Sequence, residues 1–123
     1  MLVALFGLLF LGGGIDTYLE QRLDTLEKSA KTAVVDAERR DDAEAVLKEM
    51  QKRLKARAKG VDKGRDALGD LVKDHDATDA ELEAVWDGVI AEVDTFNRDM
   101  MALRFDLKEH VTREEWAQLF PQN

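Results

Sequence analysis

A seven-residue repeat of apolar positions constrains this chain more than any other feature. Two rows run through its second half: Leu82, Val89, Phe96 and Leu103 in one, and Trp86, Val93, Met100 and Leu107 in the other. Steps of three and four that alternate over four heptads are typical of helices that pack as coiled coils. Strands would need a period of two, which these rows lack. The repeat therefore predicts an all-α protein.

The limits of the predicted helices can be read from capping signals. Residues 73–77 interrupt the repeats, and Thr78-Asp79-Ala80-Glu81 then matches a capping box, as does Thr112-Arg113-Glu114-Glu115. We predict a long helix that ends near residue 75, a return helix from about 79 to 110, and a short C-terminal helix from 113 to 120. Because their connection is tight, the long helices are expected to form an antiparallel, coiled-coil-like hairpin.

The segment Val34-Val35-Asp36 leaves two arrangements open for the first half. Two β-branched residues before a possible Asp cap favour a break. Against a break, Leu26, Ala33 and Leu47 keep one heptad phase across it. With a break, the first helix can fold back and complete a three-helix bundle. Without one, residues 15–75 form a rod of about 90 Å. We favour the break.

Charge supports the hairpin and disfavours nucleic acid as a partner. The charged residues of the stretch 48–65 are mostly basic, whereas those of the stretch 76–109 are mostly acidic. The two stretches therefore attract each other if the chain reverses between them. The net charge of −8 repels phosphates. The basic stretch also has no aromatic residue that could stack on bases. We therefore predict no nucleic-acid partner.

The first 15 residues, MLVALFGLLFLGGGI, are apolar apart from glycines. This run is short for a spanning helix, which needs about 20 apolar residues, and it lacks the positive start of a secretory signal. We predict a hydrophobic membrane anchor over residues 1–14, with a signal-like segment or burial in a soluble assembly as alternatives. Gly12-Gly13-Gly14 would be a flexible joint to a helical domain over residues 15–123. The predicted membrane contacts are Leu2, Leu5, Phe6, Leu8, Leu9, Phe10 and Leu11.

No catalytic or cofactor-binding constellation is present in the sequence, so we expect neither enzymatic activity nor a cofactor. His110 is expected near Asp41, Asp42 and Glu44, where a cluster of histidine and carboxylates could bind a divalent ion. A salt-bridged histidine near a helix C-terminus is the favoured alternative. We therefore assign no metal site.

Two groups of residues are candidates for contact with a partner: Trp116, Leu119 and Phe120 in the short helix, and Gly60 and Gly64 in the long one. The short helix must dock on something. Its own hairpin is the first alternative, and a partner or the membrane interface is the second. The glycines are unusual inside a helix. Gly64 is expected opposite Val89-Ile90, which suits internal packing, with close approach of a partner helix as the alternative.

The order of features resembles the Spy/CpxP-like periplasmic proteins. Ala77-Thr78-Asp79-Ala80-Glu81 and Val111-Thr112-Arg113-Glu114-Glu115 are similar to the LTxxQ motifs of that family, with Ala or Val for Leu and Glu for Gln. The resemblance covers residues 37–120 in outline, and related heavy-metal sensors add a membrane anchor. It implies extracytoplasmic stress sensing, metal sensing or chaperone-like binding by a free periplasmic protein.

The residues themselves favour a different function. With an anchor, heptads and no reactive site, the chain is expected to be a non-catalytic, membrane-tethered accessory subunit or adaptor of a larger complex. Its partners would be the membrane and other protein subunits, or a second copy through self-association. The absence of basic residues beside the anchor favours a bacterial inner-membrane location with the body in the periplasm.

Overall fold

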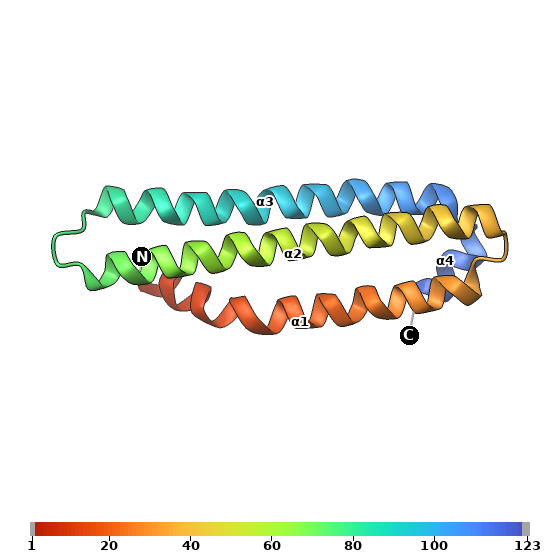
Figure 1. Cartoon of the computed structure of the whole chain (residues 1–123), viewed down its shortest axis with the longest axis horizontal. Coiled ribbons are helices and arrows are strands. Elements are labelled where there is room, and N and C mark those ends of the chain that lie inside the picture. Colours follow the sequence, from red (N-terminus) through yellow and green to blue (C-terminus); the bar gives the residue numbers. More distant parts are fainter. Residues whose placement is uncertain (1, 122–123) are drawn as a thin grey trace.

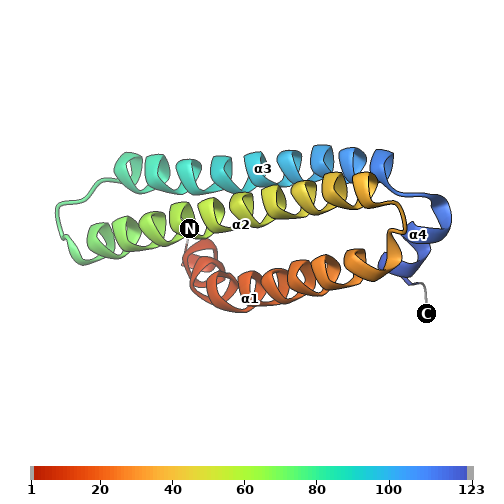
Figure 2. The same cartoon turned by 45° about the vertical axis from the view of Figure 1, so that its right-hand side comes forward.

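A computed structural model describes the backbone of residues 2–121 and the side chains of residues 17–121, and the regular structure in that part is entirely helical (Figure 1). The helices are α1 (Leu2–Ala33), α2 (Ala37–Lys73), α3 (Asp79–His110) and α4 (Arg113–Leu119). The all-α prediction is confirmed. The predicted hairpin is formed by α2 and α3, which run antiparallel along most of their lengths (Figures 1 and 2).

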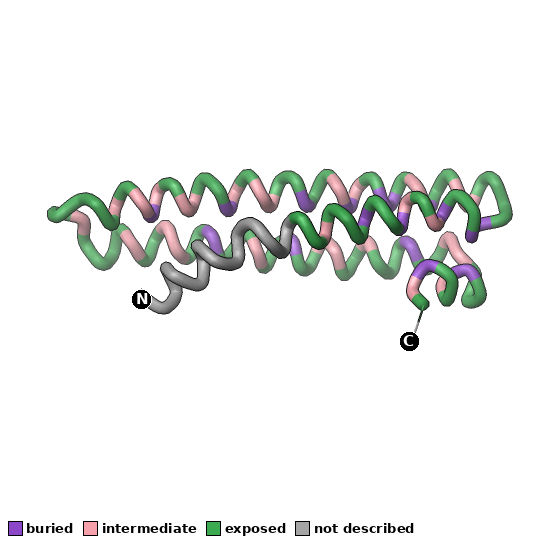
Figure 3. Tube along the Cα trace, turned by 90° about the horizontal axis from the view of Figure 1, so that it is seen from below, coloured by how far each residue is buried: buried purple, intermediate pink, exposed green. Residues whose placement is uncertain are grey.

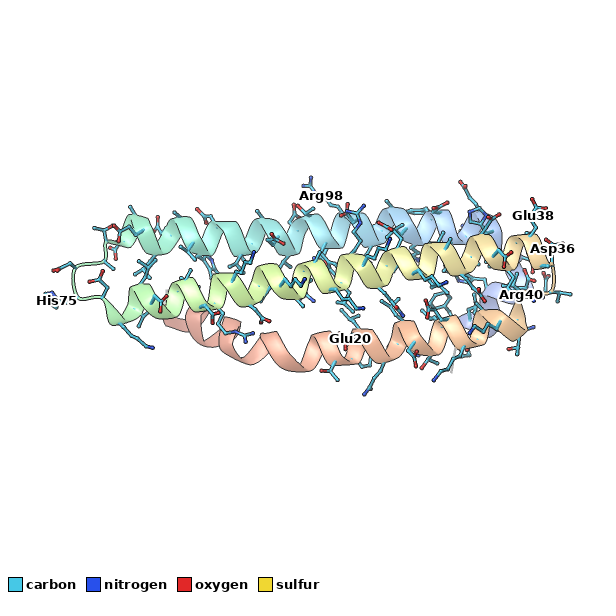
Figure 4. The ribbon with its side chains drawn as sticks, in the orientation of Figure 1. Glu20, Asp36, Glu38, Arg40, His75 and Arg98 are labelled. Atoms are coloured by element: carbon cyan, nitrogen blue, oxygen red, sulfur yellow. The ribbon has the colours of Figure 1, made fainter. Side chains whose placement is uncertain are left out.

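The chain reverses between α1 and α2, so the favoured break is confirmed. Asp36 is the N-cap of α2, and its carboxylate accepts a hydrogen bond from the backbone N–H of Arg39 at 2.9 Å. Arg40 supports the same turn, since its Nε donates to the carbonyl of Val34 at 2.9 Å. Asp36 and Arg40 lie together at this end of the molecule, and His75 lies at the opposite end (Figure 4). Local polar contacts therefore determine where α1 stops.

Both predicted capping boxes are present. The hydroxyls of Thr78 and Thr112 accept from the backbone N–H groups of Glu81 and Glu115, and the two glutamates accept from the threonine N–H groups in return. Each box satisfies amide groups that the first turn of a helix leaves unpaired. The boundaries of α3 and α4 follow from these four side chains.

The arrangement of the long helices is open. α2 packs against α3 along the hairpin and against α1, and α4 packs against α1 near the turn between α1 and α2. Contact between α1 and α3 is slight by comparison. Figures 1 and 2 show α2 between α1 and α3, with α4 near the α1–α2 turn. The chain therefore folds back as the bundle alternative requires, but α1 and α3 do not close on each other over the residues that the structure describes.

The core lies mainly at the end where four helices meet. Leu47, Leu54 and Leu107 are almost completely buried there. Towards the turn at residues 74–78 the buried side chains become sparse (Figure 3), and only Val61, Leu68 and Val89 are buried among the described residues beyond that core. Among the described side chains, this part of the hairpin thus has only a narrow seam between α2 and α3.

For residues 2–16 the structure describes the backbone alone, so only the backbone part of the N-terminal predictions can be compared with it. α1 is helical from Leu2 onward and continues through residues 12–14, so the backbone has no break at the expected glycine joint. The i to i−4 hydrogen bonds of a helix need no side chain, and for that reason glycines weaken a helix without necessarily ending it. Within residues 17–121, no helix is long and apolar enough to cross a membrane. The predicted anchor side chains, Leu2 to Leu11, lie outside the described ones, and the anchor and its boundary stay predictions.

Candidate functional site

A buried carboxylate, Glu115, positions α4. Its side chain is 7% exposed. Arg39 donates to it with both terminal nitrogens, Nη1 to Oε1 at 2.5 Å and Nη2 to Oε2 at 3.3 Å. The backbone N–H of Val35 donates to Oε2 at 3.1 Å, and that of Thr112 donates to Oε1 at 2.8 Å. One side chain therefore joins the start of α4 to the turn between α1 and α2.

These contacts keep Glu115 charged. The hydrogen bond from Arg39 lowers the pKa of Glu115 from 4.5 to about 2, although burial acts in the opposite direction. The N–H groups of Thr112 and Val35 lower the pKa further, because they also stabilise the ionised form. The same contact with Glu115 raises the pKa of Arg39. A charged hydrogen-bonded pair therefore fixes α4 at neutral pH.

With α4 in this position, a groove of about 860 Å³ opens between α1 and α3. Met50 of α2 lies at its base, Met100 of α3 forms one wall, and Leu23 of α1 belongs to the other. Trp116 and Phe120 close one end, near the place where α4 lies in Figure 2. The complete lining consists of Leu19, Arg22, Leu23, Leu26, Met50, Met100, Arg104, Arg113, Trp116, Ala117, Phe120 and Pro121. All four helices thus contribute to one mainly apolar surface.

Four basic residues, Arg22, Arg104, Lys108 and Arg113, form a basic rim around this groove. A second hollow, of about 460 Å³, adjoins the groove and shares Arg104, Arg113 and Trp116 with it. Neither hollow is lined by an acidic side chain. No member of the rim has a carboxylate within 4.0 Å in the described part of the chain. In a chain of net charge −8, this is a local concentration of basic residues without direct ion pairs.

Aromatic rings form the end of the groove next to the rim. The ring centroids of Trp116 and Phe120 are 4.5 Å apart. The guanidinium of Arg104 lies 5.1 Å from the centroid of Trp116 and 5.6 Å from that of Phe105, within the range of cation–π attraction. Met101 and Phe105, the chain neighbours of two groove residues, are 61% and 57% exposed. Exposed apolar side chains are therefore also present on α3 outside the groove.

No protein-family model, curated protein or solved structure matches this chain. The resemblance to the Spy/CpxP-like proteins stays a prediction. The two segments that carry it contain the capping boxes of α3 and α4, a local role that accounts for their Thr and Glu residues without any relationship.

The predicted contact residues of the short helix differ in exposure. Leu119 is buried in the core, whereas Trp116 and Phe120 are half-buried and line the groove. The helix therefore docks on its own chain, mainly on α1. Two aromatic side chains remain accessible at the groove, where contact with a partner stays a prediction.

Gly60 and Gly64 both face α3. A Cβ at Gly64 would collide with Val89, and one at Gly60 would meet the carboxylate of Glu92. The contact between Gly64 and Val89 is the predicted hairpin register. Gly64 thus permits close approach inside the chain, which is the packing alternative, whereas at Gly60 the exposed Glu92 side chain could move aside. Nothing in the placement of either glycine tests contact with a partner.

The charged faces of the hairpin meet as the sequence predicts. Nη1 of Arg53 lies 3.3 Å from Oδ2 of Asp99 across the two helices. Arg57 lies over the ring of Phe96 at 4.9 Å from its centroid. The basic stretch of α2 therefore uses part of its charge within the chain.

The candidate metal cluster forms only in part, because Asp42 alone of the three expected carboxylates forms an ion-pair contact with His110. Nδ1 of His110 is 3.8 Å from Oδ2 of Asp42, and Nε2 is 3.4 Å from Oδ1 of Asp106. Asp41 and Glu44 are not among its ion-pair contacts. In residues 17–121, no three histidine or carboxylate side chains are grouped so that they could hold a metal ion. His110 has the geometry of the salt-bridged alternative.

Proposed function

We propose that this protein is a non-catalytic accessory subunit or adaptor, tethered to a membrane by its N-terminal segment, that docks another protein of a larger complex in the groove between α1 and α3. The supporting observation is the groove itself, a mainly apolar surface of about 860 Å³ where four helices meet. Uncovered apolar surface with aromatic and Met side chains is common at protein-binding sites. Residues 1–14 supply the tether, and the body lies in the periplasm of a bacterial cell.

A free periplasmic chaperone or sensor is the second candidate. The observation in its favour is the presence of Met50 and Met100 in the groove and of Met101 beside it. Methionine side chains adapt to many shapes and are frequent on surfaces that bind varied partners. In this case the groove accepts unfolded segments of many proteins rather than one subunit.

Extraction of native membranes in mild detergent, followed by mass spectrometry of what co-purifies, tests the proposal. We expect one partner, or a small set, at fixed stoichiometry. Met100→Glu places a charge in the groove and should release the partner. Val72→Glu, the same kind of change at a 57% exposed position far along the hairpin, should not. Circular dichroism of both variants checks that the fold is kept.

Other outcomes separate the candidates. A lone monomer or homodimer, or soluble protein that lacks residues 1–14, is incompatible with a tethered subunit. Retention of many unrelated unfolded proteins, lost in Met100→Glu, supports the chaperone instead.

A further inference from the structure

We infer that the groove accepts an amphipathic helix of a partner protein, with apolar residues along one face and acidic residues on both sides of that face, and that this helix completes a four-helix bundle. The inference rests on the proposed function, because it names the kind of segment by which the partner docks.

The arrangement of the long helices supports a helical guest. A four-helix bundle surrounds its core on four sides, whereas here α2 has α1 and α3 as neighbours, and the described residues of these two scarcely touch. The remaining position is the groove between them. α4 lies at one end of it, but this helix has only seven residues and stops at Leu119. A guest helix that continues along the groove from α4 would cover the side chains left half-buried there.

The dimensions define how much helix is needed. From Leu19 to Leu26 the wall formed by α1 covers two helical turns, or about 10 Å. A guest of that length presents about three apolar side chains, at positions i, i+4 and i+7 of one face. They would lie between Leu19 of α1 and Met100 of α3, which are half-buried, and above the buried Met50. Trp116 and Phe120 would contact the end of the guest next to α4.

Charge selects an acidic guest. The basic rim stands beside the apolar lining, with Arg22 on α1 and Arg104 on α3, and neither hollow contains a carboxylate that would compensate it. Acidic residues that flank the apolar face of a guest would meet this rim on both sides. A guest with basic flanks would be repelled, and such repulsion contributes to the choice of partner. A second copy of this chain is the main competing occupant, because its helix α3 is itself acidic.

A peptide test separates charge preference from apolar attraction. The probe is a synthetic helical peptide of about 18 residues with Leu along one face and Glu on both sides of it, and its partner probe has Lys in place of every Glu. Binding to the full-length protein is followed by fluorescence anisotropy of labelled peptide. We expect the acidic peptide to bind at least tenfold more tightly than the basic one. Arg104→Glu combined with Arg113→Glu should abolish or reverse this preference, and Arg→Lys at both positions should keep it.

Photo-crosslinking identifies the natural occupant. A photoreactive amino acid replaces Ala117, an exposed residue of the groove, and a control replaces Ala45, an exposed residue of α2 that does not line it. In the detergent-extracted protein we expect crosslinks from position 117, and not from position 45, to one partner protein. The crosslinked residues of that partner should lie three or four positions apart in its sequence and close to Glu or Asp residues.

The outcomes distinguish this inference from the proposed function. A stable complex whose partner crosslinks through an extended or basic segment, or not at all at position 117, overturns the acidic helix and leaves the adaptor intact. Crosslinks to lipid or to a second copy also overturn it, as does equal binding of the two peptides. If no complex is isolated, the adaptor fails, and the peptide preference still decides whether the groove selects acidic helices.

Discussion

Replacement of Glu115 by Gln tests how α4 is held. Gln can still accept the hydrogen bond from the N–H of Thr112, since Glu and Gln both serve at this position of a capping box. The change therefore keeps the helix start and the size of the side chain. It removes the negative charge that Arg39 contacts with two nitrogens, and it weakens the acceptor for the N–H of Val35.

The structure gives the size of the effect. A fall of the pKa of Glu115 from 4.5 to about 2 corresponds to roughly 3 kcal/mol of stabilisation at neutral pH, which is an upper value. The side chain of Arg39 is 35% exposed, and solvent screens its charge. Hydrogen bonds to charged groups contribute about 1.5–3 kcal/mol. We expect Glu115→Gln to lower the free energy of unfolding by about 1–2 kcal/mol.

The dependence on pH has a definite sign. The pKa of Glu115 is depressed in the folded state, so its contribution is fully present above the unfolded value of 4.5 and is lost as the pH falls towards about 2. The difference in stability between wild type and Glu115→Gln should therefore be constant from pH 7 to pH 5 and should shrink between pH 5 and pH 2. Other carboxylates titrate in the same interval, but they do so in both proteins and cancel in the difference.

Urea denaturation followed by circular dichroism at several pH values measures this difference. Glu114→Gln is the matched control, because Glu114 is an exposed neighbour on the first turn of the same helix, and it should change the free energy of unfolding by less than about 0.5 kcal/mol. A Glu115→Gln variant as stable as wild type at pH 7 would refute the reasoning. A loss that stays the same down to pH 2 would show that shape, and not charge, is responsible.

Two further substitutions test the packing of the hairpin by the same denaturation assay. Gly64→Ala should be destabilising despite the better helix propensity of alanine, because the new Cβ collides with Val89. Gly69→Ala, which has open space around it, should stabilise by up to about 1 kcal/mol. Equal effects of the two substitutions would refute the close approach of α2 and α3 at Gly64. Leu107→Ala should cost about 2–5 kcal/mol, since this side chain is fully buried, and Met101→Ala, at a 61% exposed position, should cost much less; similar losses would contradict the described core.

Local signals explain why the helix limits were predictable. Thr78 and Glu81 lie three residues apart, and a capping box needs nothing beyond that spacing. Asp36 acts over a similarly short distance, because it caps the N–H of Arg39. The hairpin register also followed from the sequence, because a reversal near residues 76–78 places Gly64 opposite Val89-Ile90, and the structure brings Gly64 against Val89.

The contacts around α4 could not be predicted in the same way. Arg39 and Glu115 are 76 positions apart, and each has local neighbours of the opposite charge that would have been equally reasonable partners. The groove is also a product of tertiary structure, because its wall and floor come from four helices and depend on α1 and α3 staying apart. The basic rim is not visible in the sequence either, because Arg22 lies more than 80 positions before Arg104 and only the fold brings the two together.

The ion pair between Arg39 and Glu115 and one end of the groove both involve α4. The shape of the groove should therefore depend on this ion pair. Glu115 is followed directly by Trp116, whose ring lies tilted against that of Phe120 at the end of the groove. If the contact with Arg39 is what fixes α4, its loss should let Trp116 move before the long helices separate. Glu115→Gln at pH 7 should then weaken binding of the acidic peptide while helix content stays unchanged, and Glu114→Gln should leave binding intact. Unchanged binding by Glu115→Gln would mean that the remaining contacts, with buried Leu119 foremost, hold α4 without the charge.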